Sequence, residues 1–398
     1  MRYASSTNIN RQTQLFCRDS ILAGHFDMVQ SDQSIAVVTV PNISEYNPER
    51  VNYGICSKLI PEFDVTLLGA EQTSERIESS FEVKSFVTRD YENKWIRRML
   101  LIPLTFYLVY MYVRQEQPDV IASFGNLSVN GLVCALFSKL TSSKSVVRVT
   151  SDFTNLWKYQ TGVPATVGCF VKNNVLGMAA VRLADAVIVL GPVMRKKLKQ
   201  RDIDESKLWV IPQPLHIEAE ESTTSKDVRS ELDIPEHARV VLFVGYFKQS
   251  KGPERLVRTT ECVIEHDSGI HVVIVGSSGE YEEYVRQTLG EYDQVHLTGW
   301  VPHEHLPVYF RTADVLLHPS NSEGLPNVVL EALYFELPIV ATDSGGEVPV
   351  YVSNIGDDYR ELSEMILKGE FVLDSYPDAV RDRESGHRYQ QLFKALTY

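Results

Sequence analysis

Residues 315–349 read VLLHPSNSEGLPNVVLEALYFELPIVATDSGGEVP, and the fold of the chain can be worked out from this stretch. The stretch predicts five features in direct succession: a short apolar strand, a polar loop, an apolar helix, a second strand and a glycine turn. In open α/β sheets, ligands bind at the carboxyl ends of the strands. The stretch therefore predicts a parallel α/β unit that holds a ligand at its polar loop.

The polar loop is predicted to hold an anion. The run 320–322 (Ser, Asn, Ser) can cap a helix whose first turn carries Pro326 and Asn327. We then expect the backbone N–H groups near Gly324, Leu325 and Asn327 to point outward. A helix start with such N–H groups favours an anion, above all a phosphate.

Two carboxylates flank this predicted phosphate site. Glu323 lies in the loop, and Glu331 lies one turn inside the helix, on the same face as Asn327 because four residues separate them. Carboxylates beside a phosphate accept hydrogen bonds from hydroxyl groups, and a nucleotide sugar carries hydroxyl groups on both sides of its diphosphate. The alternative is an ordinary βαβ unit whose acidic residues only favour the helix dipole.

The glutamate pair resembles a known signature. Seven residues separate Glu323 from Glu331 within EGLPNVVLE, and PIVAT and the pair 345–346 (Gly-Gly) follow. This pattern resembles retaining glycosyltransferases of the GT-B fold, family 4 in particular (glycosyl transferases group 1). The resemblance implies two Rossmann-like doubly wound parallel-sheet domains facing a cleft, with a nucleotide sugar on the C-terminal domain. It also implies that Glu331 holds the ribose hydroxyl groups and that Glu323 orients the transferred sugar.

The segment 238–252, ARVVLFVGYFKQSKG, predicts a strand that ends at Gly245, then a loop and a helix start. It resembles a family loop that carries two cations, one directly after the glycine and one before the second glycine. Lys251 matches the second cation, and the resemblance implies that it stabilises the leaving diphosphate. Tyr246 stands at the first position, so Lys248, on the same face of an extended segment, is the candidate substitute.

Further strand ends are expected to line the cleft. Gly125 and Asn126 follow one predicted strand of the N-terminal half, and Ser151 and Asp152 follow the next. Family members often have a histidine near Ser151 or Asp152 that faces the donor sugar, so these four residues are candidates for the acceptor or sugar side. Alternatively, Ser151 or Asp152 caps the following segment. By resemblance, Val301 contacts the nucleotide base through its backbone.

Length and charge limit the remaining choices. A chain of 398 residues with 44% hydrophobic content suits two globular domains, and a net charge of -13 argues against a nucleic-acid partner. We expect an extension over residues 1–34, an acceptor-side domain over 35–213 and a nucleotide-sugar domain over 214–385. A helix over residues 386–398 should cross back to the N-terminal domain.

Nothing in the sequence calls for a metal or a cofactor. No carboxylate pair is spaced like a diphosphate-metal site, and the cysteines are scattered without a CxxC pair, so neither a zinc site nor a disulfide framework is indicated. The five are Cys17, Cys56, Cys134, Cys169 and Cys262. A polar N-terminus without an apolar signal core and this cysteine usage favour a cytoplasmic location.

Residues 99–113, MLLIPLTFYLVYMYV, form an apolar run. As a helix they would span about 22 Å, short of the ~30 Å hydrocarbon core of a bilayer. One interpretation is a helix that covers the N-terminal sheet. The other is an interfacial helix with Arg97, Arg98 and Arg114 on lipid phosphates, which predicts peripheral membrane contact through residues 97–114.

These features together predict a retaining, metal-independent, hexosyl-type glycosyltransferase with a nucleotide-sugar donor and a glycan or lipid-linked acceptor. Two alternatives belong to other classes. Tyr246 and Ser151 suggest a non-catalytic subunit of a glycan-assembly complex, and the fold would also suit a sugar-nucleotide epimerase. The intact EGLPNVVLE argues against both alternatives.

Overall fold

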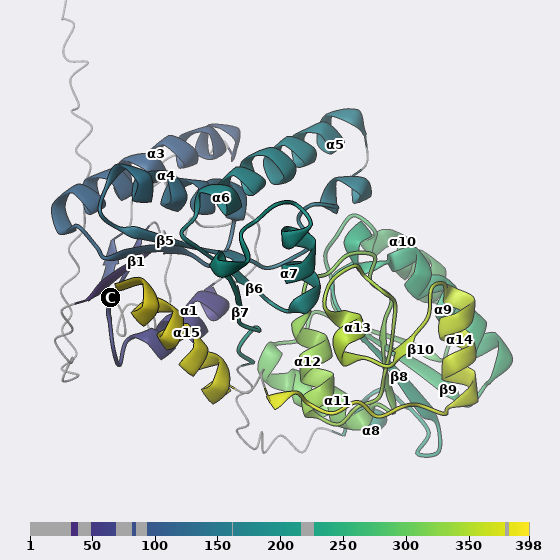
Figure 1. The fold of residues 1–398 in the computed structure, drawn as a ribbon. Coiled ribbons are helices and arrows are strands. Elements are labelled where there is room, and N and C mark those ends of the chain that lie inside the picture. Colours follow the sequence, from purple (N-terminus) through teal and green to yellow (C-terminus); the bar gives the residue numbers. More distant parts are fainter. Residues whose placement is uncertain are drawn as a thin grey trace, which may run out of the picture.

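The computed structural model describes residues 33–38, 49–68, 82–84, 94–160, 162–215, 227–378 and 382–397. They form two open parallel sheets, each with helices on both faces (Figure 1). The predicted doubly wound α/β fold with two Rossmann-like domains is therefore confirmed. The extension expected over residues 1–34 lies almost wholly outside the described residues.

The first sheet has seven parallel strands in the order β3-β2-β1-β4-β5-β6-β7. They are β1 (Ser34–Val38), β2 (Asp64–Leu68), β3 (Glu82–Lys84), β4 (Val120–Ser123), β5 (Lys144–Val149), β6 (Ala186–Val189) and β7 (Leu208–Val210). β1 pairs with β2 on one side and with β4 on the other. The strand order therefore reverses between β1 and β4, which is where open α/β sheets bind ligands.

Helices cover both faces of this sheet. They are α1 (Glu49–Leu59), α3 (Lys94–Glu116), α4 (Leu132–Leu140), α5 (Val163–Phe170), α6 (Met178–Leu183), α7 (Pro192–Lys199) and α15 (Asp382–Thr397), with short turns η1 (Leu127–Gly131), η2 (Leu156–Tyr159), η3 (Val171–Gly177) and η4 (Glu205–Lys207). In Figure 1, α3, α4 and α6 lie on one face of the sheet, and α1 and α15 lie on the other.

The continuous apolar strands follow from this double cover. Ile35 and Val37 of β1 pack in the core formed with α1 and α15, whereas Ala36 and Val38 pack in the core under α3 and α4. Successive side chains of a strand point to opposite faces, so both sets must be apolar when both faces are buried.

Helix α3 contains the apolar run 99–113 and is longer than predicted. Val109, Tyr112 and Val113 are buried in the core with α4, and Tyr107 and Tyr110 are exposed. The interpretation as a helix that covers the N-terminal sheet is confirmed for these described side chains. Over the described parts of the chain, no helix is long and apolar enough to cross a membrane.

The last helix crosses back as predicted, although it begins at Asp382 rather than at 386. Tyr389, Leu392 and Phe393 are fully buried in the core of the first sheet. The phenyl ring of Phe393 lies 6.1 Å from that of Phe63. The C-terminal segment is therefore part of the N-terminal domain.

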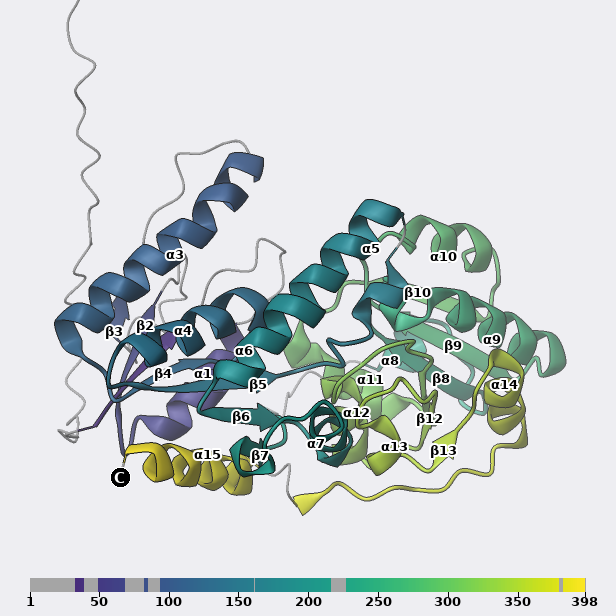
Figure 2. The same cartoon turned by 45° about the horizontal axis from the view of Figure 1, so that its top comes forward.

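The second sheet has six parallel strands in the order β10-β9-β8-β11-β12-β13. They are β8 (Arg239–Val244), β9 (Ile270–Val275), β10 (Val295–Gly299), β11 (Val315–His318), β12 (Ile339–Ala341) and β13 (Asn354–Ile355). Its helices are α8 (Val228–Glu231), α9 (Pro253–His266), α10 (Glu282–Leu289), α11 (Leu306–Thr312), α12 (Asn327–Tyr334), α13 (Val348–Tyr351) and α14 (Tyr359–Lys368), with turns η5 (Gln249–Lys251) and η6 (His303–His305). Figure 2 shows the two sheets side by side.

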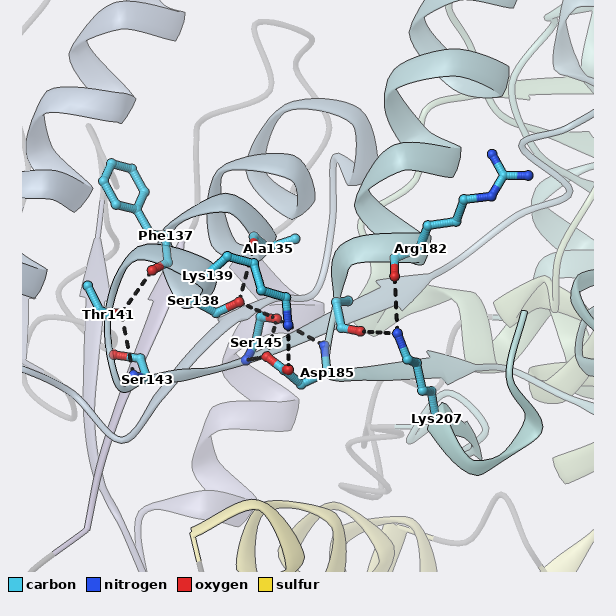
Figure 3. A network of polar contacts seen from close by, with 11 residues as sticks. Ala135, Phe137, Ser138, Lys139, Thr141, Ser143, Ser145, Arg182, Asp185 and Lys207 are labelled. Carbon is cyan, nitrogen blue, oxygen red and sulfur yellow. Dashed lines mark hydrogen bonds and ion pairs between the residues drawn. The ribbon is translucent and has the colours of Figure 1, made fainter. Parts of the chain in front are cut away.

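A polar network fastens the amino ends of β5 and β6, as Figure 3 shows. Asp185 accepts hydrogen bonds from the backbone and the hydroxyl of Ser145 and from Lys139 Nζ, each at 2.7 to 2.8 Å. Burial alone would raise the pKa of Asp185, but these donors hold it below its ordinary value. The network lies at the end of the strands opposite to their carboxyl ends, so its role is structural.

Candidate functional site

Loops that follow the strands of the two sheets meet between the domains. Ser151, after β5, forms an isolated antiparallel bridge with Gly324, after β11. Gly346, after β12, packs so closely that a Cβ on it would collide with the carbonyl oxygens of Glu323 and Gly324. The glycine pair that the sequence singled out thus allows two loops of the C-terminal domain to approach each other beside the N-terminal one.

Lys251 and Glu323 form an ion pair at this meeting point. Lys251 Nζ lies 2.6 Å from Glu323 Oε1, and Ser320 Oγ donates to the same oxygen at 2.9 Å. The two loops are joined by the backbone, since Asn321 N donates to the carbonyl oxygen of Ser250 at 2.8 Å. Burial raises the pKa of the Glu323 carboxyl, but the charge of the Lys251 ammonium and the hydrogen bonds from Lys251 and Ser320 together act in the opposite direction, and the pKa lies below its ordinary value.

His318, the last residue of β11, lies beneath this pair. It is 3% exposed, and its Nε2 lies 3.8 Å from Glu323 Oε1, which is too long for a hydrogen bond. Burial lowers the pKa of His318 to about 4, so the imidazole is neutral at pH 7. Its Nε2 has no hydrogen-bond partner among the described residues. The sequence interpretation missed His318, and a histidine that ends the apolar strand VLLH was the available signal.

The capping prediction for residues 320–322 is wrong. Helix α12 begins at Asn327, and its N-cap is Pro326, which makes no side-chain cap. Ser320 instead donates to Glu323. The polar run is separated from the helix by the turn at 323–326, so the Ser320 side chain positions the acid and not the helix start.

The predicted amide donors have different surroundings. Gly324 is bridged to Ser151 of the N-terminal domain, and Leu325 is buried in the core of the second sheet. Asn327 is exposed at the first position of α12. The expectation that these amides bind a phosphate stays a prediction.

Glu331 is buried one turn inside α12. Its Oε1 lies 2.7 Å from Nε2 of His303 in η6, and His303 itself is partly exposed. The sequence interpretation missed His303, which follows the strand end that carries Val301. Val301 packs against the core of the second sheet, two residues beyond β10. A hydroxyl group that binds Glu331 must therefore share the carboxylate with His303 or displace it.

The glycine loop after β8 has the predicted form. Gly245 N donates to Val275 O at 2.9 Å, and Lys251 immediately precedes Gly252, the N-cap of α9. Lys248 Nζ lies 5.9 Å from the centre of the Tyr246 ring, so the two side chains share a face, as their spacing predicted. In the structure, only Lys251 of these two lysines is paired with Glu323.

Asp152 links the two domains through a residue that the sequence interpretation missed. Asp152 is buried, and its Oδ2 lies 2.7 Å from Lys197 Nζ of α7. Lys197 Nζ also donates to the carbonyl oxygen of Gly345 in the C-terminal domain. Asp152 further accepts from the Thr154 hydroxyl and from Asn155 Nδ2. These are bonds between side chains, and the N-cap of η2 is Asn155, so Asp152 does not take the capping role that the sequence left open.

Glu347 makes a second link that was not predicted. It is 1% exposed, and its two carboxylate oxygens accept hydrogen bonds from Val193 N and Met194 N at 3.1 and 2.9 Å. These amides belong to the first turn of α7, whose N–H groups lack partners within the helix. Burial raises the pKa of Glu347 above its ordinary value. Its position directly after the glycine pair was the available signal.

Gly125 and Asn126 lie at the carboxyl end of β4. Asn126 has a left-handed backbone (φ 48°), and its carbonyl oxygen accepts from Val129 N and Asn130 N. These contacts stay within their own loop. Among the described residues, no group of three or more His, Cys, Asp or Glu side chains could hold a metal ion.

Comparison with known proteins finds a family match over the C-terminal domain. Residues 224–356 match the family described as Glycosyl transferases group 1. TuaC of Bacillus subtilis (strain 168), provisionally named a teichuronic acid biosynthesis glycosyltransferase, is 29% identical over 168 residues. The match covers 42% of this chain and 41% of TuaC, so the chain spans about two fifths of the length of that curated relative.

Solved structures match over nearly the whole chain. Sucrose-phosphate synthase from Thermosynechococcus elongatus has a TM-score of 0.66 at 19% identity, covering 92% of this chain and 94% of the synthase. HepE from Anabaena, solved in complex with UDP and glucose, has a TM-score of 0.62 at 16% identity, covering 91% of this chain and 95% of HepE. Likeness at these identities shows a shared fold.

Proposed function

We propose that this chain, which has the GT-B fold and matches the Glycosyl transferases group 1 family over residues 224–356, transfers a hexosyl-type sugar from a nucleotide-sugar donor to an acceptor. The C-terminal domain holds the donor, and the N-terminal domain holds a glycan or lipid-linked acceptor. The transfer retains the anomeric configuration and uses neither a metal nor a cofactor. A cytoplasmic location also stays a prediction from the sequence.

The pair of Lys251 and Glu323 carries this proposal. Both side chains are mostly covered, both are charged, and they stand at the carboxyl ends of β8 and β11. When the bond between the sugar and the diphosphate breaks, negative charge grows on the diphosphate. A fixed ammonium beside a helix start stabilises that charge more in the transition state than in the ground state. Glu323 orients the sugar hydroxyl groups once Lys251 turns toward the phosphates.

Glu331 provides a test of the donor position. Its carboxylate accepts the ribose hydroxyl groups in this proposal, so Glu331→Ala should weaken binding of the nucleotide sugar and of the nucleoside diphosphate together. We expect a loss of about tenfold or more, the scale of a charge-assisted hydrogen bond. Calorimetric titration measures both affinities. Unchanged affinity for the diphosphate would contradict the assignment.

A thermal-shift screen over nucleoside-diphosphate sugars tests the proposed function. UDP-glucose is the first probe, because HepE was solved with UDP and glucose. A ligand present at 100 times its dissociation constant should stabilise the protein by about 2.7 kcal/mol. Absence of any shift across uridine, guanosine and adenosine diphosphate sugars would overturn the proposal.

A donor-turnover assay separates the alternatives. A transferase releases nucleoside diphosphate slowly without acceptor and faster with it, whereas an epimerase converts the sugar and keeps the nucleotide sugar intact. A non-catalytic subunit binds the donor and changes neither. Tyr246 in place of the family's cation is the observation that favours this last alternative, and Lys251 paired with Glu323 is the observation against it.

A further inference from the structure

One helix of the N-terminal domain exposes apolar side chains along its length. We call residues 162–176, which form α5 and most of η3, the apolar arm. The helix α5 has no buried residue, and η3 buries only Gly177. Apolar side chains of the arm are 38 to 77% exposed, and they are Val163, Val167, Phe170, Val171, Val175 and Leu176. A helix of a globular protein usually turns such residues toward the core.

The pattern of the arm is the reverse of an ordinary surface helix. Its partly covered positions are polar or small, namely Thr166, Cys169, Asn173 and Asn174, while all four of its valines are exposed. The arm runs on without a break into α6, whose Met178 and Val181 are buried (Figure 2). The apolar face is therefore fixed in place by the sheet, and the described residues leave it largely uncovered. Apolar patches of this kind mark interaction surfaces.

The charge of the residues around the apolar arm indicates what kind of surface the arm binds. Residues 153–184 contain no Asp or Glu, although the whole chain has 52 acidic residues and a net charge of -13. The cations of this segment, Lys158, Lys172 and Arg182, are all exposed. A cationic apolar face is complementary to an anionic surface, and two copies of it would repel each other. Lys158 also lies over the ring of Trp157, an aromatic residue that suits a water-lipid boundary.

We propose that the apolar arm docks the protein on an anionic lipid bilayer. The arm is about 22 Å long at ~1.5 Å per residue, so it lies in the interface and does not cross the ~30 Å core. Its valines and Phe170 enter the headgroup boundary, and Lys158 and Lys172 contact lipid phosphates. The ring of Phe170 packs against Trp157 of η2. The turn η2 lies against η5, which ends in Lys251. Docking therefore brings the bilayer near the donor site.

The test uses the full chain and vesicles of two compositions. The protein is floated with vesicles of phosphatidylcholine alone and of phosphatidylcholine with 40% phosphatidylglycerol, at low and high salt. We expect binding to the anionic vesicles, at least several-fold weaker at high salt because screening reduces the attraction. The double variant Val167→Glu/Val171→Glu should lower the bound fraction at least tenfold. Its matched control is Val372→Glu/Leu373→Glu, which alters two equally exposed apolar residues of the C-terminal domain and should bind like the wild type.

Each outcome decides the proposal. Circular dichroism and melting temperature show that both double variants are folded, which is expected because all four side chains are exposed. Equal binding by the arm variant and the control, or no binding by the wild type, overturns the proposal. A wild-type dimer in light scattering that the arm variant dissociates, without vesicle binding, also overturns it and makes the arm a contact between copies. None of these results depends on sugar transfer, so they are separate from the test of the proposed function.

Discussion

Lys251 and Glu323 show how two local sequence signals become one electrostatic unit. Each sits at the carboxyl end of a strand, and β8 and β11 are neighbours in the second sheet. The 2.6 Å contact between Nζ and Oε1 is a charge-assisted hydrogen bond in a mostly covered site. A diphosphate would offer Lys251 a stronger partner than a single carboxylate, so under the proposed function the pair is a resting arrangement from which a bound donor would release Glu323.

Replacing Lys251 and Lys248 by alanine, one at a time, separates their contributions to catalysis. Lys251→Ala should lower kcat by about 100-fold or more, the scale of a lost oxyanion donor, with a smaller change in donor affinity. Lys248→Ala should cost roughly tenfold or less, because Lys248 lies beside Tyr246 and is not the partner of Glu323. Steady-state kinetics with saturating acceptor measures both values. The opposite order would mean that Lys248 holds the diphosphate.

The buried His318 should make the protein sensitive to acid. Burial lowers its pKa in the folded protein to about 4, against about 6.5 when unfolded, so the unfolded chain binds the proton first as pH falls. Stability should therefore fall between about pH 6.5 and pH 4, by about 2 kcal/mol from pH 7 to pH 5. Urea unfolding at both pH values measures the loss.

The variant His318→Gln isolates this effect. Burial also lowers the pKa of His271 and His296, so only the difference between wild type and variant belongs to His318. The variant should lose about 2 kcal/mol less between pH 7 and pH 5 than the wild type does. An identical pH dependence of the two proteins would contradict a neutral buried imidazole.

The site residues that could not be predicted from the sequence are those whose hydrogen-bond partners lie far away along the chain. Lys251, Glu323 and Glu331 stand out because a recurring motif surrounds them. Glu347 accepts hydrogen bonds from the backbone amides of Val193 and Met194, which precede it by 154 and 153 positions. No local sequence pattern predicts a contact over such a distance along the chain. The mistaken cap at residues 320–322 has a local origin instead, since Ser320 bonds to Glu323, three residues further on, and not to a helix N–H group.

At the scale of single elements, strands were predictable and helix ends were not. The strand β1 is a continuous apolar run because both faces of the sheet are covered, and this pattern is visible in the sequence. Helix α12 begins after a turn that the polar run does not reach. The apolar arm is rich in valine, glycine and asparagine, which favour a helix only weakly, and its exposure depends on what packs against it, which a sequence does not state.

The C-terminal helix α15 offers a measurable case of burial. Phe393 is fully buried between Phe63 and Phe124, although it belongs to the last helix of the chain. Phe393→Ala should lower the free energy of unfolding of the N-terminal domain by about 3 to 5 kcal/mol, because it removes buried surface and leaves a cavity. The control Phe170→Ala, in the exposed arm, should cost about 1 kcal/mol or less. Chemical denaturation distinguishes them, and equal losses would contradict the packing of α15.

At the scale of the whole molecule, a small number of polar contacts join the domains. The bridge of Ser151 with Gly324, the hydrogen bond from Lys197 to the carbonyl oxygen of Gly345 and the carboxylate of Glu347 all lie between the carboxyl ends of the two sheets. Closure of domains around a substrate excludes water and completes a site. Contacts that stabilise the closed arrangement without a ligand raise the fraction of molecules ready to bind the donor.

Glu347 should therefore control the distance between the domains. Glu347→Gln replaces one of the two carboxylate oxygens by an NH2 group, which then faces the backbone N–H of Val193 or Met194. Two donors face each other without an acceptor, and a buried donor left without a partner costs about 1 to 3 kcal/mol. A cost of about 2 kcal/mol shifts the equilibrium roughly 30-fold toward an open form. Small-angle scattering of the unliganded variant should give a larger radius of gyration than the wild type, and donor affinity should fall with the closed fraction. The control Glu205→Gln alters an exposed partner of Arg195 within the N-terminal domain and should change neither quantity. Matching scattering curves for Glu347→Gln and the wild type would show that the domains are held together by other contacts.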